Sequence, residues 1–229
     1  MENLLLKYME KGFLERELLS EQAVRPFITL SREFGCPSKL IAQQLADALN
    51  HRPRHKNTPL WRFVNKEVVI EAARELELEP DKIKYLFDAE IRGTLDDILA
   101  SFSSNYRSST RVRRITREVI GSIARKGHVI LVGRGGVAIT QGYPSSLHVR
   151  LQAPLDWRIR EVSRRRGISE AEALHLAVET DRKRKELIEI FQGKKFENTL
   201  FDLIFNCKSL STQEIIEGII HMMEKKKMI

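Results

Sequence analysis

Hydrophobic residues along this chain gather in short segments that are separated by longer stretches with helical spacing. Continuous apolar runs lie at residues 27–31, 128–132 and 201–207, and residues 147–153 alternate apolar with polar side chains. Runs of this length, rich in β-branched residues, are typical of buried strands in a parallel sheet. The pattern predicts an open parallel sheet of about five strands.

The intervening stretches carry apolar residues at the spacing of one helix face. Residues 39–49 have this spacing, with Ile41 and Leu45 on the apolar side. Pro154 begins another helix at a position where its missing N–H costs nothing. Serine and glutamate at capping-box spacing begin two more helices, at residues 169–172 and 211–214. Strands that alternate with long helices indicate an α/β fold with right-handed crossovers.

Two segments stand outside this alternation. Residues 1–25 contain an amphipathic helix, which is expected to pack on its own domain or, alternatively, to make a homodimer contact. Segment 60–126 is too long for a crossover helix, and we expect it to be a helical insertion that covers one edge of the sheet. Residues 26–229, including this insertion, are predicted to form one domain.

Two loops are predicted to lie at the carboxyl edge of the sheet, where open parallel sheets bind their ligands. The first has the sequence SREFGCPSK at residues 31–39 and connects a strand to a helix. The second is the sharp turn GRGG at residues 133–136. Consecutive backbone N–H groups and a helix N-terminus at such an edge can hold phosphates. Both loops are therefore candidates for a phosphate site.

The charge balance is basic, with 39 Lys and Arg against 31 Asp and Glu and a formal net charge of +8. This balance fits a partner that carries phosphate, either a nucleotide or a nucleic acid. A group of arginines at residues 107–117 can be interpreted as a nucleic-acid patch. Only Phe102 and Tyr106 accompany it for stacking, and the sequence has no helix-turn-helix or zinc module. Nucleic acid is therefore the less favoured partner.

Cysteine content and hydrophobicity bear on the compartment. The two cysteines, Cys36 and Cys207, lie far apart in the sequence and have neither metal-ligand spacing nor the pattern of a disulfide framework. This usage predicts a reducing cytoplasm. The sequence has no apolar run of about 18 residues, so no membrane-spanning helix is expected.

Five segments, taken in order and spacing, resemble the cytidylate kinase-like family, a branch of the nucleoside monophosphate kinases. They are ITLSREFGCPSKLIAQQLADAL, VILVGRGGVAI, LHVRLQAPLDWRIREVSRRRGISEAEA, ETDRKR and FDLIFNCKSLSTQEIIEGI. The resemblance covers roughly residues 26–222. It implies a three-layer P-loop NTPase-like fold, a monophosphate-binding insertion at about 60–126 and a lid at about 155–195.

The resemblance assigns nucleotide binding to the first loop, which departs from the family pattern S-R-E-[FY]-G-S-G-G-R. Residues 31–35 match this pattern, whereas Cys36, Pro37, Ser38 and Lys39 replace its glycine-rich end. Pro37 removes one N–H donor and restricts the residue before it. The residues implied in phosphate binding are Arg32, Gly35, Cys36, Ser38 and Lys39. Lys39 is interpreted either as the counterpart of the P-loop lysine or as a solvated lysine.

The resemblance assigns substrate binding to the second loop and to the insertion. Gly133 and Arg134 match the family turn G-R-D, and Gly135 takes the place of its aspartate. Arg107 and Arg111 are the candidates in the insertion for holding the phosphate of the acceptor. Alternatively, Arg134 lies in an ordinary surface turn and has no role in binding.

The family's lid implies a third group of residues. Arg158 and Arg184 are expected to stabilise charge on the transferred phosphoryl group together with Lys39, and Asp181 belongs to the substrate site. Arg164 and Arg165 also match lid arginines, although Arg165 and Arg166 are expected to be solvated. The alternative for the whole group is a solvated helix face in a basic protein.

These assignments imply a reaction in which ATP phosphorylates a nucleoside monophosphate, with CMP as the first candidate. The implied cofactors are ATP and Mg²⁺, and Ser38 is the nearest hydroxyl for the metal because Leu40 stands where a threonine is usual. The second interpretation is a catalytically degenerate kinase-like module that binds nucleotides or another protein. The third is a basic nucleic-acid binder.

Overall fold

The computed structural model describes residues 25–53, 58–64 and 110–229. The predicted N-terminal helix, apart from Arg25, and residues 65–109 of the predicted insertion lie outside the described residues. The homodimer contact and the division of the chain into domains therefore stay predictions.

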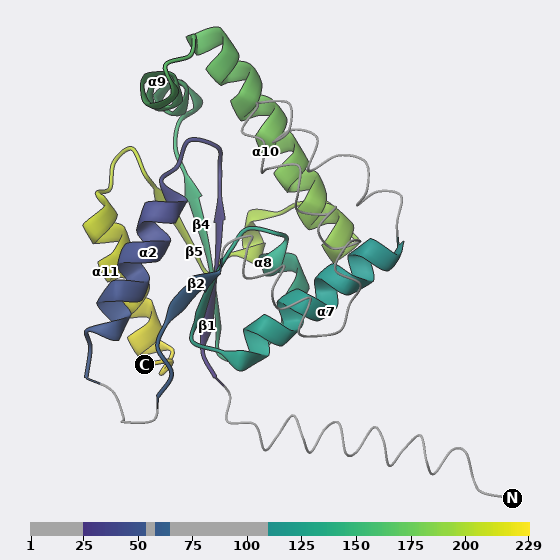
Figure 1. Ribbon diagram of the computed structural model, residues 1–229, viewed down its shortest axis with the longest axis vertical. Helices are drawn as coiled ribbons and strands as arrows, with labels where there is room; N and C mark the ends of the chain where they lie inside the picture. Colours follow the sequence, from purple (N-terminus) through teal and green to yellow (C-terminus); the bar gives the residue numbers. More distant parts are fainter. Residues whose placement is uncertain (1–24, 54–57, 65–109) are drawn as a thin grey trace, which may run out of the picture.

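Five parallel strands form the centre of the fold (Figure 1), which confirms the predicted sheet. They are β1 (Phe27–Arg32), β2 (Arg62–Val64), β3 (Val129–Val132), β4 (Ser146–Gln152) and β5 (Leu203–Asn206). Their spatial order is β2-β3-β1-β4-β5. Strand β2 lies in a basic segment, interrupted by prolines, in which no strand was predicted.

Strand β1 is the middle strand, and its position decides which loops become neighbours. Ile28 pairs with Ile130 of β3 on one side and with Leu147 of β4 on the other. Ile28 and Leu30 are fully buried, as expected for a strand covered on both faces. The loop after β1 therefore lies between the loops that follow β3 and β4.

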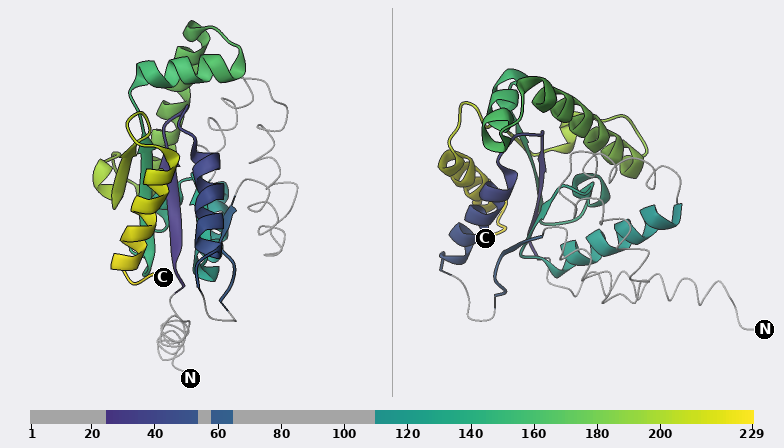
Figure 2. Two further views of the ribbon diagram at one scale, coloured as in Figure 1. Left: turned by 90° about the vertical axis from the view of Figure 1, so that its left-hand side faces the viewer. Right: turned by 45° about the horizontal axis from the view of Figure 1, so that its top comes forward.

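Helices cover both faces of the sheet, which gives three layers (Figures 1 and 2). Helices α2 (Ser38–Asn50) and α11 (Thr212–Lys225) pack on one face. Helices α7 (Thr110–Lys126), α8 (Gly136–Ile139) and α10 (Glu170–Gln192) pack on the other. Helix α9 (Leu155–Arg166) lies beyond the carboxyl edge of the strands, and a short 3-10 helix (Asn198–Leu200) precedes β5.

Local sequence signals account for the starts of α10 and α11. The Ser169 side chain accepts a hydrogen bond from the Glu172 N–H, and the Glu172 carboxylate accepts one from the Ser169 N–H. The same reciprocal pair opens α11 at Ser211, so both predicted capping boxes are confirmed. Pro154 precedes α9 as its N-cap, one position before the predicted place inside the helix. Each of these signals depends only on residues close together in the chain.

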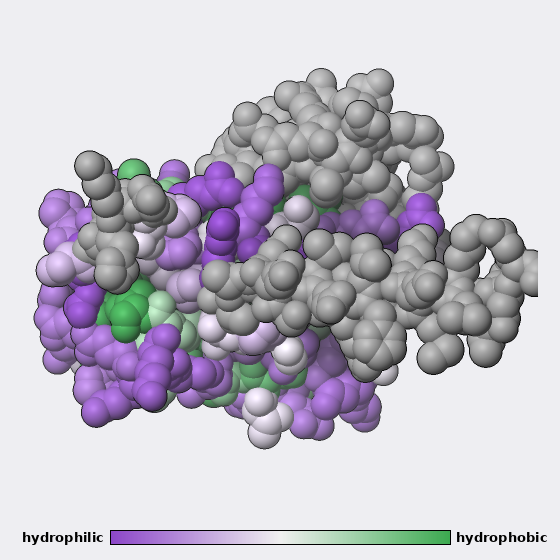
Figure 3. All heavy atoms as spheres, turned by 90° about the horizontal axis from the view of Figure 1, so that it is seen from below, coloured by the Kyte–Doolittle hydropathy of each residue, from purple (hydrophilic) through white to green (hydrophobic). Residues whose placement is uncertain are grey.

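A hollow lies at the amino-terminal edge of the sheet. It has a volume of about 740 Å³ and is lined by Leu49, Trp61, His128 and Met228 among others. Seen from this side, hydrophobic residues form patches within a mostly hydrophilic surface (Figure 3).

Among the helices of the described residues, none is long and apolar enough to cross a bilayer.

His148 is a buried titratable group in β4. Its Nδ1 lies 2.8 Å from the Thr29 hydroxyl oxygen. Burial lowers the pKa of His148 from its ordinary value of 6.5, Asp202 opposes this shift, and Lys226 adds to it. The folded protein therefore binds a proton at His148 less readily than the unfolded chain does.

We expect stability to fall as the pH drops below the ordinary histidine pKa. Because the unfolded chain takes up the proton first, His148 contributes stability above about pH 6.5 that is lost toward its lower folded pKa. The urea midpoint should decrease between about pH 7 and about pH 5. His148→Asn, which keeps a polar partner for Thr29, should reduce this pH dependence. An identical pH dependence in the variant would contradict the assignment.

Candidate functional site

A cavity of about 360 Å³ lies at the carboxyl edge of the sheet, where the loops after β1 and β3, the end of β4 and one side of α10 meet. It is lined by Ser31, Arg32, Glu33, Gly133, Arg134, Gly135, Arg150, Gln152, Asp181, Arg184, Lys185, Leu187, Ile188, Phe196 and Asn198. Four arginines and one lysine face two carboxylates in this lining. The balance of charge favours an anionic ligand.

The turn after β3 requires glycine for steric reasons. Gly133 has a φ of +74°, and a Cβ at this position would lie 1.9 Å from Nη1 of Arg32. Gly135 has a φ of +69°, and its Cβ would lie 2.5 Å from Cδ2 of Phe191 in α10. The glycines therefore allow the Arg32 guanidinium and helix α10 to approach the turn. Arg134 has a φ of +57°, an uncommon conformation for a residue with a side chain.

The first loop is folded back on itself. The Cys36 N–H donates to the Glu33 carbonyl at 3.3 Å, and the Ser38 N–H donates to the Cys36 carbonyl at 2.9 Å. The Phe34 N–H donates to Oδ1 of Asp181 at 2.7 Å. Pro37, the N-cap of α2, has no N–H to offer. In this conformation the loop does not present the consecutive N–H groups that hold a nucleotide triphosphate.

The second half of this loop, from Gly35 to Lys39, does not line the cavity. Within the described part of the chain, the lining includes none of Gly35, Cys36, Ser38 and Lys39. Ser38 is buried and Lys39 is exposed. The described residues contain no cluster of three or more histidine, cysteine, aspartate or glutamate side chains suited to a metal. Ser38 as a ligand of Mg²⁺ therefore stays a prediction that this loop conformation does not fit.

Arg158, in the first turn of α9, is the most buried arginine of the site, with 6% of its surface exposed. Its Nε donates to the Ala153 carbonyl at 2.9 Å, and its Nη1 donates to the Phe34 carbonyl at 2.9 Å. Nη1 also donates to Oδ2 of Asp181 at 2.7 Å, and Nε lies 3.4 Å from Oε2 of Glu33. Arg158 thus connects α9, α10 and the first loop, and it is not among the residues that line the cavity.

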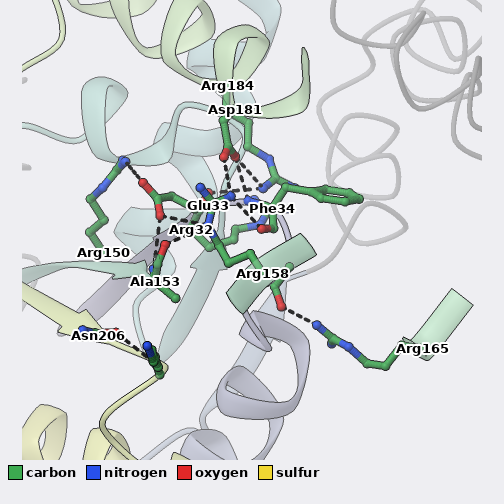
Figure 4. A network of polar contacts seen from close by, with 12 residues as sticks. Arg32, Glu33, Phe34, Arg150, Ala153, Arg158, Arg165, Asp181, Arg184 and Asn206 are labelled. Atoms are coloured by element: carbon green, nitrogen blue, oxygen red, sulfur yellow. Dashed lines mark hydrogen bonds and ion pairs between the residues drawn. The ribbon is translucent and has the colours of Figure 1, made fainter. Parts of the chain in front are cut away.

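Asp181 and Glu33 are the two acids of this network, and they point toward Arg158 (Figure 4). Burial raises the pKa of Asp181, whereas the Phe34 N–H and the guanidinium groups of Arg158 and Arg184 oppose this shift. The Glu33 carboxylate accepts a hydrogen bond from the Ala153 N–H at 3.2 Å and pairs with Arg150 at 3.3 Å. The carboxylates therefore hold α9, α10 and β4 against the first loop.

The structure brings one part of the predicted site together at the cavity. Arg32, Gly133, Arg134, Gly135, Asp181 and Arg184 line one cavity, although they come from β1, the turn after β3, and α10. Nη1 of Arg184 also donates to the Arg32 carbonyl at 3.2 Å. Arg107 and the side chain of Arg111 lie outside the described residues.

Several residues of the site were not predicted. Arg150 lines the cavity and lies with its Cζ 4.8 Å from the centre of the Phe196 ring. Arg150 is one of the polar residues in the alternating pattern at 147–153, and this position near the end of a strand could have indicated a site residue. Phe196 lies in a loop, and no pattern in the sequence indicated it. Arg165 and Arg166 are exposed, as expected, and in addition contact the first loop. Nη2 of Arg165 donates to the Gly35 carbonyl, and Cζ of Arg166 lies 5.1 Å from the centre of the Phe34 ring.

The chain is similar to known proteins in sequence and in fold. A family model described as the cytidylate kinase-like family matches residues 27–209. An uncharacterized protein from Eubacterium ventriosum has a similar structure, with a TM-score of 0.61 at 19% identity over 88% of this chain and 99% of that one. A shikimate kinase from Bacteroides thetaiotaomicron has a TM-score of 0.50 at 14% identity over 87% of this chain and 98% of that one. At such identities these likenesses concern the fold alone.

A curated relative matches only in part. A uronate isomerase from Corynebacterium glutamicum is 25% identical over 144 residues, which make up 62% of this chain and 27% of that protein. The chain therefore spans about a quarter of the length of this relative, whose name describes the whole of that longer protein.

Proposed function

This chain belongs to the cytidylate kinase-like family, and we propose that it binds a nucleoside monophosphate in the arginine-lined cavity. The protein would then transfer a phosphoryl group from ATP to this monophosphate, with CMP as the first candidate. The observation that supports this most is the convergence of Arg32, Arg134, Arg150 and Arg184 on one cavity of about 360 Å³. A cavity of this size suits a small ligand, and guanidinium groups are well suited to bind a phosphate through paired hydrogen bonds.

The cavity offers different groups to the two ends of such a ligand. The guanidinium groups of Arg32, Arg134 and Arg184 can neutralise a phosphate and orient its oxygens. Phe196 supplies an aromatic face, and Gln152 and Asn198 supply amides that can donate or accept hydrogen bonds to a base. This division between cationic and neutral polar residues supports a nucleotide rather than inorganic phosphate.

The donor side is supported by the family and not by the loop as it is folded. Phosphoryl transfer depends mainly on positioning and on charge stabilisation, which ATP and Mg²⁺ bring to a kinase when bound. The first loop must release the N–H groups of Phe34 and Ser38 before it can hold a triphosphate. We therefore assign no catalytic step to the residues of this loop.

A second candidate function, nucleotide binding without transfer, is favoured by the same loop. Pro37 lacks an N–H, and the N–H groups on either side of it at Cys36 and Ser38 are bonded within the loop. Calorimetry with CMP and with ATP, beside an assay for ADP formation, separates the two functions. The kinase should bind both nucleotides and form ADP only when CMP is present. Binding of CMP without ADP formation supports the second candidate, and absence of CMP binding contradicts both.

Exchanging the segment CPSK at residues 36–39 for SGGR is expected to increase ATP affinity and turnover. The exchange restores an N–H at position 37 and the glycine freedom that a phosphate-binding loop uses. CMP affinity should not change, because the exchanged residues are absent from the lining of the cavity within the described residues. Calorimetry with each nucleotide measures the two effects separately. Unchanged ATP binding in this variant would show that the loop sequence is not what limits the donor site.

A further inference from the structure

The two cysteines of the chain, far apart in the sequence, are neighbours in the fold. Cys36 lies in the first loop, and Cys207 directly follows β5. Their exposed fractions are 9% and 8%, and both belong to the hydrophobic cluster beneath α2 and α11. Each thiol shifts the pKa of the other, as expected for close neighbours within this cluster.

Strand β4 explains why the two cysteines meet. The Glu33 N–H donates to the Leu151 carbonyl at 3.0 Å, and the Cys207 N–H donates to the Gln152 carbonyl at 2.8 Å. Consecutive residues of β4 thus anchor the segments that carry the two thiols. Since β4 lies between β1 and β5 in the sheet, the strand order itself places the cysteines at the same edge.

We propose that Cys36 and Cys207 form a reversible disulfide, and that this pair is a modification site for a hydroperoxide. Two thiols that share one buried cluster, on segments anchored to consecutive residues of β4, need only a local movement to reach the S–S bond length of about 2.05 Å. The site joins the first loop to the end of β5. No metal, cofactor or second protein is required besides the oxidant and a thiol reductant.

The chemistry has two steps. The Cys207 thiolate attacks one oxygen of hydrogen peroxide, the O–O bond breaks, and the leaving hydroxide takes up a proton to become water. Cys36 sulfur then attacks Sγ of the resulting sulfenic acid, and its proton leaves with the hydroxide as a second water. Two thiols and one hydrogen peroxide thus become one disulfide and two waters. A small thiol reverses the reaction by exchange.

The surroundings favour Cys207 as the attacking sulfur. The neighbouring Cys36 thiol lowers the pKa of the Cys207 thiol, although burial opposes this shift. The neighbouring Cys207 thiol raises the pKa of Cys36, as do burial and the nearby Glu33 carboxylate. A thiolate is the reactive form of cysteine, so the first attack falls to Cys207 and the second to Cys36.

The disulfide would act on the donor side of the proposed function. Cys36 also provides the carbonyl that accepts the Ser38 N–H, so a bond through its sulfur would hold the closed turn of the first loop in place. Oxidation should therefore abolish or weaken ATP binding and leave CMP binding unchanged. This consequence rests on the proposed function, whereas formation of the disulfide does not.

Peptide mass spectrometry of the full-length protein tests the bond directly. The protein is treated with hydrogen peroxide, its thiols are counted after denaturation, and its peptides are analysed without reduction. We expect loss of both thiols, a linked pair of peptides containing Cys36 and Cys207, and recovery of both thiols with dithiothreitol. Cys36→Ser and Cys207→Ser should each lack the linked peptides. Thiols that stay reduced, oxidise without linking or link two chains would overturn the proposal.

A second measurement separates the disulfide from the proposed function. ATP and CMP binding are compared by calorimetry in the oxidised and the reduced protein, with Cys207→Ser as the control that cannot form the bond. Loss of ATP binding only in the oxidised parent protein supports a lock on the loop. Equal ATP binding in both forms contradicts the lock. If the reduced protein binds neither nucleotide, the proposed function fails while the mass measurement still decides the disulfide.

Discussion

Replacing Arg158 by methionine is expected to lower the free energy of unfolding by about 3 to 5 kcal/mol, because removing one partner of a buried ion pair leaves the other charge uncompensated. Arg158 is 6% exposed and faces the carboxylates of Asp181 and Glu33. The change also leaves the carbonyls of Ala153 and Phe34 without this donor. Methionine keeps most of the volume, so the effect should come from charge and hydrogen bonding.

Urea denaturation measures this effect, and the same helix provides a matched control. Arg160 pairs with Asp156 on the exposed side of α9. Arg160→Met should leave the urea midpoint nearly unchanged, because exposed ion pairs contribute little to stability. Equal midpoints for Arg158→Met and Arg160→Met would contradict a structural role for the buried arginine.

Replacing Arg184 by alanine is expected to weaken CMP binding by about ten- to a hundredfold, the effect of losing a charged hydrogen bond of about 1.5 to 3 kcal/mol. Arg184 lines the cavity from α10. Its Nη1 also donates to the carbonyl of Arg32, a second arginine of the lining. Its loss would remove one positive charge and one support for a neighbouring cation.

Arg182 is the matched control for this binding experiment. It lies on the same helix, but its guanidinium pairs with Glu179 and Glu186 on the exposed side. Calorimetry should therefore find the CMP affinity of Arg182→Ala unchanged. Urea midpoints of both variants verify that the fold is intact. Unchanged affinity in Arg184→Ala would remove this arginine from the proposed acceptor site.

The two predictions distinguish two uses of arginine at one edge of the sheet. Arg158 is surrounded by protein oxygens and holds α9 and α10 to the first loop. Arg184 borders the cavity, where a ligand can reach it. Both had been assigned to phosphoryl transfer from the resemblance of the lid. Their different burial gives separate measurements, stability for Arg158 and ligand affinity for Arg184.

The elements that could be predicted are those whose signals lie within one short segment. The strands at the centre of the sheet are marked by apolar runs, and α10 and α11 are marked by capping boxes. Strand β2 was missed because it has three residues, Arg62 to Val64, which are too few for a hydrophobic period. Its pairing with β3 comes from tertiary contacts rather than from a local pattern.

By itself, the sequence determined the α/β class, the positions of the main strands and helices, and the two loops at the carboxyl edge. Only the tertiary structure decided that Asp181 accepts the Phe34 N–H, that Arg158 is buried, and that Cys36 meets Cys207. Periodicity and capping arise between residues a few positions apart. The contacts of the site depend instead on the strand order, which brings the ends of β3, β1, β4 and β5 to one edge from distant parts of the chain.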